Sequence, residues 1–329
     1  MDKKLSGKNV VMAVDCGKDA TKVSVFVKRL GGRIESRKYT FRTRLALRSG
    51  LEESSFQRID EAEYEGKGYV WGNHVSDITV NVHSNSKRDV NHKLCTLIAI
   101  AEHVDKGDSV HVAIGCPIQV FTDREAKNEY LDYIVPKGWQ EIVVNGEYKY
   151  FYIASRTCFA ESTGLVGIYP GIFGDRVVGV FDIGGLNVNC ALFINSNLKP
   201  DKCFTTQDGY YSILNRLAGK LSDETGTDLD AAYIPSIIKA GKIEKIPHTE
   251  GIVREYMESH LKRITDTARN RGWNIDVAKL VFSGGCSELL RSYITAQFPG
   301  DLIVDDPVFA NARGFLAMFV QALEAAGKI

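Results

Sequence analysis

Long hydrophobic runs, closely spaced cysteine pairs and a net charge are all absent from this chain of 329 residues. No window approaches the ~18 consecutive apolar residues of a membrane-spanning helix, and no signal-peptide-like segment follows Met1. We therefore expect a cytoplasmic protein that does not bind membranes. Basic and acidic residues number 41 each, which removes the electrostatic basis for direct binding to nucleic acid. The seven cysteines form no Cys-x-x-Cys pair, so the sequence favours reduced thiols in the core over zinc or disulfide sites.

What is present indicates an ordinary folded protein. Apolar residues make up 44% of the chain and charged residues 25%, close to the average for globular domains. A length of 329 residues is enough for about two domains, each with its own core.

The most informative pattern is an internal repeat at an offset of 167 residues. In the first copy, residues 11–17 (VMAVDCG) are followed by the apolar segment 23–27; in the second, residues 178–184 (VGVFDIG) are followed by 190–194. Each copy predicts a buried strand, a tight turn and a returning strand. In both copies an Asp ends the first strand and a Gly stands two positions later.

Such a turn suits phosphate binding. Glycine lets the backbone approach a ligand closely, so that consecutive amides can converge on an anion, and the Asp can hold a hydrated divalent metal. A single Asp-x-Gly is often only a hairpin turn. Two copies at matched positions favour a nucleotide held by both.

A third glycine turn follows the apolar residues 280–282. Ser283, Gly284 and Gly285 come directly before residues with helical spacing, which predicts a strand, a loop and a helix start suited to phosphate or nucleoside oxygens. No Walker motif and no Gly-x-Gly-x-x-Gly after a strand occurs in the sequence, which disfavours a P-loop enzyme and a dinucleotide dehydrogenase.

Strands and helices alternate along the rest of the chain, which predicts two α/β domains. We expect a strand at 110–115, a hairpin at 141–153 with an Asn145-Gly146 turn, and helices at 124–134, 158–169, 210–224, 252–271 and 311–326.

Three such turns in this order resemble those of the actin-like ATPase superfamily, which includes actin, Hsp70 and sugar kinases. Within it, the sequence is most similar to the ParM-type bacterial plasmid-segregation actins, through Gly115-Cys-Pro117, the 141–153 hairpin and Ala160-Glu161-Ser162. The resemblance implies an α/β actin-like fold of two duplicated domains, each with a mixed sheet flanked by helices and with nucleotide in the cleft between them. Domain I would be residues 1–169 with the helix 307–329 packed back onto it, and domain II residues 170–306.

The resemblance also implies roles for particular residues. Asp15 and Asp182 would order the water shell of Mg²⁺, and Glu161, entering the first connecting helix, would position or deprotonate the attacking water. An ordinary first-turn glutamate is the alternative for Glu161. The remaining nucleotide-binding candidates are Gly17, Lys18, Asp19, Lys22, Gly184, Gly185, Leu186, Asn187, Ser283, Gly284, Gly285 and Glu288. Lys18 departs from the family, where many members carry Ser or Thr, so its role stays open.

By this resemblance, we expect an ATPase, with GTP as the alternative nucleotide, that forms dynamic head-to-tail filaments and segregates plasmid DNA. A DNA-binding adaptor of the ParR type, on a centromere-like site, would link the filament to its cargo. The alternative function is a monomeric sugar or small-acid kinase of the same superfamily.

Two neighbouring segments of opposite charge fit a filament. Residues 28–48 carry eight Lys and Arg against one acid, Glu35, and residues 52–65 carry six acids against Arg58. Opposite patches on successive subunits could attract, although a solvated strand edge beside a loop explains the pattern equally well. The polar stretch from His83 to Asp89 predicts an exposed loop, and the histidine spacing disfavours a zinc site.

Overall fold

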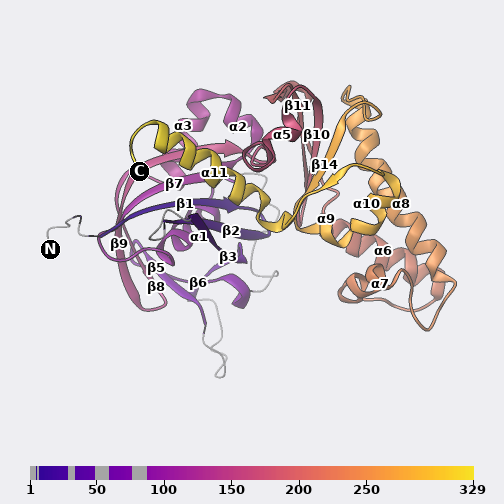
Figure 1. Ribbon diagram of the computed structural model, residues 1–329. Helices are drawn as coiled ribbons and strands as arrows, with labels where there is room; N and C mark the ends of the chain where they lie inside the picture. The colour runs from indigo at the N-terminus through magenta and orange to yellow at the C-terminus, as the bar shows by residue number, and fades with distance from the viewer. Residues whose placement is uncertain (1–4, 6, 29–33, 49–58, 76–86) are drawn as a thin grey trace. The chain divides into compact units, whose positions relative to one another are not determined.

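The computed structural model describes residues 5, 7–28, 34–48, 59–75 and 87–329 (Figure 1). The chain forms two compact units. Unit 1 comprises Met1–Ile168 and Asn311–Ile329, and unit 2 comprises Tyr169–Ala310. Among the described residues, no helix is both long and apolar enough to cross a membrane.

Unit 1 is built on a mixed sheet with the described strand order β3-β2-β1-β7-β9-β8-β5-β6-β4. The three central strands, β1, β7 and β9, run parallel, and the outer strands pair antiparallel. The strands are β1 (Asn9–Cys16), β2 (Ala20–Lys28), β3 (Ile34–Arg42), β4 (Leu45–Leu47), β5 (Glu61–Tyr64), β6 (Lys67–Trp71), β7 (Ser109–Cys116), β8 (Gly138–Val144) and β9 (Glu147–Ala160).

Strand β1 is apolar from Val10 to Val14 because helices cover both faces of its sheet. Val10, Met12 and Val14 belong to a core shared with α1 (Val90–Ala101) and α3 (Arg124–Ile134). Val11 and Ala13 point the other way and pack with Phe315 and other apolar residues of α11 (Ala310–Ala325). Two short helices, α2 (Ile118–Thr122) and α4 (Leu165–Ile168), also belong to the described part of unit 1, and α2 is labelled in Figure 1.

Unit 2 has a second mixed sheet in the order β12-β11-β10-β14-β15, with β13 also paired to β11. Strands β10 and β11 are antiparallel, whereas β14 runs parallel to β10. The strands are β10 (Val177–Ile183), β11 (Val188–Ile194), β12 (Asn197–Leu198), β13 (Phe204–Thr206), β14 (Lys279–Ser283) and β15 (Leu302–Ile303). The helices are α5 (Pro170–Phe173), α6 (Tyr210–Thr225), α7 (Ile234–Ala240), α8 (Thr249–Asn270), α9 (Gly285–Leu289) and α10 (Arg291–Gln297).

Most predicted elements are confirmed with small shifts at their ends. The helix predicted at 124–134 is α3, those predicted at 210–224, 252–271 and 311–326 are α6, α8 and α11, and Asn145-Gly146 joins β8 to β9 with a positive φ at both residues. Six of the cysteines, all but Cys203, are buried.

The helix predicted at 158–169 is wrong. Cys158 and Ala160 end the long strand β9, where they pair with Ile114 and Cys116 of β7. This pairing across the sheet overrides the helical spacing of the local sequence. Helical structure begins only at Leu165 and is interrupted before Pro170.

Candidate functional site

The turn after β1 is a tight backbone loop that follows a buried carboxylate. Asp15 is 6% exposed, and the amide of Gly17 donates to the carbonyl of Ala20 at 3.0 Å. A Cβ on Gly17 would lie 2.9 Å from that carbonyl oxygen, so this close approach requires glycine. Lys22 pairs with Asp15 across the hairpin, and its Nζ lies 3.8 Å from Asp15 Oδ2.

The turn after β10 repeats this arrangement. Asp182 pairs with Asn189, and the amide of Gly184 donates to the carbonyl of Asn187 at 2.9 Å. Each of these positions lies 167 residues beyond its counterpart in the first turn. The predicted repeat of two hairpins is therefore confirmed, and the two turns share the same backbone hydrogen bond.

The start of α6 supports the second turn. Tyr210 and Tyr211 donate their amides to the carbonyls of Gly184 and Gly185, each at 3.0 Å. Gly209 packs so closely against the turn that a Cβ there would lie 2.6 Å from the amide nitrogen of Asn187. The backbone around Leu186 is thus fixed by the helix behind it.

The glycine pair lies beside Asp182. Ser283, which is buried, pairs with Asp182 in the parallel strands β10 and β14. Gly284 has φ +84°, and a Cβ on it would lie 2.5 Å from Asp182 Oδ1. Gly285 then opens α9, while Glu288 is exposed and pairs with Arg291 at 2.7 Å. Apart from Glu288, the candidate residues of unit 2 therefore lie at the ends of β10 and β14 or directly after them.

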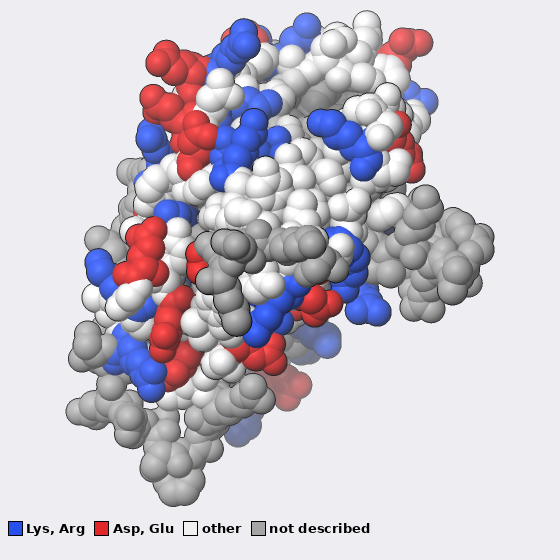
Figure 2. All heavy atoms as spheres, turned by 90° about the vertical axis from the view of Figure 1, so that its left-hand side faces the viewer, with Lys and Arg blue, Asp and Glu red and all other residues white. Residues whose placement is uncertain are grey.

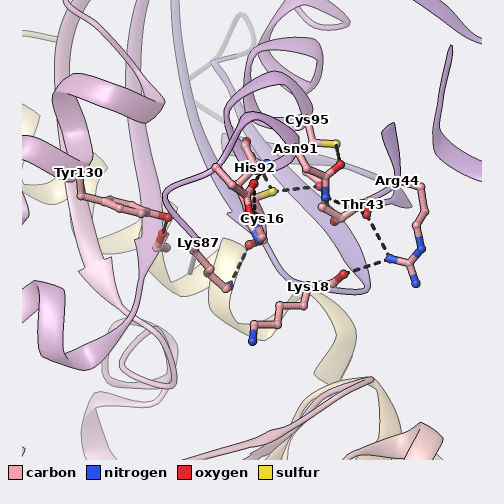
Figure 3. A network of polar contacts seen from close by, with 12 residues as sticks. Cys16, Lys18, Thr43, Arg44, Lys87, Asn91, His92, Cys95 and Tyr130 are labelled. Atoms are coloured by element: carbon pink, nitrogen blue, oxygen red, sulfur yellow. Dashed lines mark hydrogen bonds and ion pairs between the residues drawn. The ribbon is translucent and has the colours of Figure 1, made fainter. Parts of the chain in front are cut away.

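A buried ion pair lies beneath the first turn. The ammonium group of Lys87 donates to the carbonyl of Cys16 at 2.9 Å and forms an ion pair with Glu161 Oε1. Burial raises the pKa of Glu161, but the charge and hydrogen bond of Lys87 outweigh it and hold the pKa below its ordinary value. Burial lowers the pKa of Lys87, but Glu161 and Asp15 more than compensate, so its pKa is raised. Figure 3 shows Lys87 directed at the end of β1.

Glu161 lies in a turn, not at the start of a helix. Its amide donates to the carbonyl of Cys116 at 2.9 Å, and the next residue, Ser162, has φ +67° although it is 1% exposed. The expectation that Glu161 enters the connecting helix is therefore wrong, because β9 runs up to Ala160 and α4 begins after Gly164. Consequently, the alternative of a glutamate stabilised by a helix dipole does not apply.

Arg44 is a buried residue that hydrogen-bonds to the backbone of the first turn. It is 1% exposed and donates through Nη1 to the carbonyl of Lys18 at 3.1 Å (Figure 3). Its Nη2 lies 3.4 Å from Asp19 Oδ1, and Arg42 lies 3.7 Å from the same oxygen. The carboxylate of Asp19 is thus engaged by two arginines. Burial, followed by repulsion from the positive charge of Lys87, lowers the pKa of Lys18.

The two charged segments are partly neutralised within the chain. Arg44 is buried, so it belongs to no surface patch, and Arg48 of the basic segment pairs with Glu61 of the acidic segment at 3.3 Å. Figure 2 shows Lys and Arg intermixed with Asp and Glu over one face. The side chains of Lys28 and Glu35 and the residues Arg29, Arg33, Glu52, Glu53 and Arg58 lie outside the described part of the chain.

The exposed loop predicted for residues 83–89 is wrong at Lys87, which is buried, while residues 83–86 lie outside the description. The sequence did not identify Lys87 or Arg44 as site residues, because each lies among other charged residues and has no distinguishing pattern. Gly115 was noted only as part of Gly-x-Pro. A Cβ on it would lie 3.1 Å from Asp15 Oδ1, so it leaves room for that carboxylate as Gly284 does for Asp182.

The donor set fits a magnesium-bound phosphate. Each turn places a carboxylate, the kind of hard oxygen ligand that Mg²⁺ prefers, beside glycine backbone that admits close approach. Asp15 in unit 1 and Asp182 in unit 2 are each a carboxylate of the kind that can bind Mg²⁺ through water.

Comparison with solved structures identifies the fold. The chain is similar to the archaeal actin homologue Ta0583 at 19% identity and TM-score 0.74, over 95% of this chain and 99% of that one. Ta0583 has also been solved in complex with ADP. An Alp12 filament structure is 25% identical with TM-score 0.69, over 95% and 99% of the two chains. The 15-stranded ParM filament from Clostridium botulinum is 15% identical with TM-score 0.69, over 96% and 100%. The class is therefore that of proteins with the actin-like fold.

Sequence comparison gives one family match, to the N-terminal part of the chain. Residues 13–164 match the family described as "Actin like proteins N terminal domain". This segment, just under half of the chain, includes both the first turn and Glu161, and it is similar to the N-terminal domain of actin-like proteins. Among curated protein sequences, none matches the chain significantly.

Proposed function

We propose that this protein binds and hydrolyses a magnesium-bound nucleoside triphosphate and assembles into head-to-tail filaments. The observation that carries the proposal is the matched pair of turns, in which Gly17 and Gly184 make the same hydrogen bond two residues after an Asp. ATP is the preferred nucleotide and GTP the alternative. That Ta0583 was solved with ADP, and that Alp12 and ParM were solved as filaments, supports the proposal.

In this proposal, Glu161 accepts a proton from the attacking water, and the backbone of the turns contacts the phosphates. The candidate binding set is completed by Lys18 and Lys22 at the first turn of unit 1, and by Ser283 at the end of β14 and Glu288 in α9 of unit 2. Magnesium, if bound with the nucleotide, would supply neutralisation of phosphate charge.

The biological task we propose is plasmid segregation in the cytoplasm. Nucleotide binding strengthens the contact between subunits, and hydrolysis after assembly weakens it, so that filaments grow and collapse. An adaptor of the ParR type on a centromere-like site would connect the filament to DNA.

Sedimentation tests assembly directly. We expect the protein to pellet with Mg-ATP or Mg-GTP and to pellet more stably with a non-hydrolysable analogue. A protein that stays soluble at high concentration under all these conditions is not a filament former, and a monomeric kinase of the same fold would then be the function to examine.

Phosphate release tests the proposed base. Glu161→Ala is expected to form filaments while losing about 100-fold or more in hydrolysis, the typical contribution of general base catalysis. Unchanged hydrolysis in normal filaments would remove Glu161 from the mechanism.

A further inference from the structure

Lys87 is a buried cation surrounded by acceptors. The residue is 7% exposed, its Nζ lies 2.9 Å from the carbonyl oxygen of Cys16, and it is ion-paired with Glu161. Asp15 is close enough to contribute to its electrostatics. Such a group needs strong partners, because an ammonium group without them is costly to bury.

The position of this cation matters as much as its burial. Cys16 directly precedes Gly17, so Lys87 lies at the base of the first turn, where the proposed phosphates would bind. A second ammonium group at this turn, that of Lys22, lies 3.8 Å from Asp15 and is more exposed, at 20%. Lys87, by contrast, is shared between the turn and Glu161.

The ion pair makes Glu161 a weak base. Burial raises the pKa of this carboxyl, but Lys87 holds it below its ordinary value, whereas a general base works best when its pKa is near the working pH. Removal of Lys87 from the carboxylate would take away the largest influence that lowers its pKa, leaving the weaker charges of His92 and Lys22 against burial, and would raise the basicity of Glu161. Hydrolysis therefore requires an anion that competes with Glu161 for the ammonium group of Lys87.

We propose that Lys87 is a latch that exchanges partners, from Glu161 in the nucleotide-free protein to the terminal phosphate of a bound nucleoside triphosphate. This inference rests on the proposed function. The exchange frees Glu161 to take a proton from water while the water oxygen bonds to the terminal phosphorus. The bond from that phosphorus to the bridging oxygen breaks, and its electron pair leaves with the diphosphate.

A nucleoside diphosphate lacks the terminal phosphate that would bind Lys87. The latch should therefore make the protein bind a triphosphate more tightly than a diphosphate. The measured quantity is the dissociation constant of ADP divided by that of a non-hydrolysable ATP analogue, both with Mg²⁺. Lys87→Met is expected to lower this ratio about tenfold, since one charge-assisted contact to the terminal phosphate is lost. Lys87→Arg retains the charge and is expected to restore part of the ratio.

Glu161→Gln is expected to change the ratio in the opposite direction. It removes the carboxylate that competes with the terminal phosphate for Lys87, so triphosphate binding should tighten relative to diphosphate binding. Arg88→Met is the matched control, because Arg88 is the next residue in sequence but is half exposed and pairs with Glu129 at 2.6 Å. It should leave the ratio unchanged.

The outcomes are distinct. If wild-type protein binds neither nucleotide, the proposed function fails and the latch fails with it. If wild-type protein binds both and Lys87→Met keeps the wild-type ratio, only the latch is overturned. If Lys87→Met does not fold, Glu161→Gln and the double variant Lys87→Met/Glu161→Gln, which leaves no lone buried charge, decide the question. A ratio in Glu161→Gln that is unchanged or lowered also overturns the latch.

Discussion

Gly314 of α11 lies directly against Gly164, so closely that a Cβ on Gly314 would fall 1.8 Å from the carbonyl oxygen of Gly164. Gly167 approaches the same place, since a Cβ there would lie 2.7 Å from the carbonyl oxygen of Gly314. Backbone therefore packs on backbone where α11 crosses the segment that contains α4, a few residues after Glu161.

Gly314→Ala is expected to lower the free energy of unfolding by about 2 kcal/mol or more, because the contact has no space for a methyl group. Urea denaturation followed by circular dichroism measures this change. Gly219→Ala is the control: Gly219 is exposed within α6, and a Cβ there would meet nothing within 4 Å, so this change should stabilise by about 0.5 kcal/mol. Equal stability of the two variants would contradict the packing.

Adjacent glycines give a second matched pair. Gly284→Ala requires an alanine at φ +84° with its Cβ 2.4 Å from the carbonyl oxygen of Ile183, so we expect a loss of about 2 kcal/mol or more. At Gly285 a Cβ would make only an ordinary contact with Val308, at 3.6 Å. Thermal unfolding should therefore show a large decrease in Tm for the first variant and little change for the second.

Arg44 provides a test of the support behind the first turn. Arg44→Met is expected to destabilise the protein by about 3 kcal/mol and to weaken nucleotide binding, because it removes a buried donor to the Lys18 carbonyl and leaves Asp19 with one arginine fewer. Arg42→Met, which removes a more exposed partner of Asp19, should cost less than 1 kcal/mol. Similar effects of the two changes would show that the burial of Arg44 is not important.

His260 in α8 should make the stability of the protein depend on pH. It is fully buried and receives a 2.9 Å hydrogen bond from Arg263 Nη2, with Asp208, Arg216 and Tyr256 also near. Burial, followed by the charge of Arg263, lowers the pKa of His260 to about 4.

Because its folded pKa is below the unfolded value of about 6.5, His260 contributes stability that is complete above pH 6.5 and is lost as the pH falls towards 4. Between pH 7 and pH 5 this loss amounts to about 2 kcal/mol. Denaturant titrations at several pH values measure this loss. In His260→Gln, the free energy of unfolding should fall by about 2 kcal/mol less between pH 7 and pH 5. An identical slope in both proteins would contradict the assignment.

The sequence predicted the strand-end turns because their signals are local. An apolar strand, an Asp and a Gly at fixed spacing are sufficient for a hairpin, and the second copy of the pattern strengthened the prediction for Asp15 and Asp182. The end of β9 was missed because Cys158 and Ala160 are held in a strand by β7, a partner more than 40 residues away.

Lys87 and Arg44 were missed for a related reason. A charged residue is buried when partners from distant parts of the chain neutralise it, and neither the Lys87 pair with Glu161 nor the Arg44 contact with Lys18 leaves a periodic signal. The assignment of phosphate and metal contacts to individual residues likewise stays a prediction, to be tested by the variants above.

The shared register of the two hairpins has a consequence for the charge beside each turn. The backbone position opposite Asp15 carries the ammonium of Lys22, whereas the position opposite Asp182 carries the amide of Asn189. Unit 1 therefore has a positively charged side chain opposite the aspartate, whereas unit 2 has a neutral amide at the same position. The two turns therefore share their backbone hydrogen bond and differ in charge, so an anion would meet a positive side chain at this position of the first turn and a neutral one in the second.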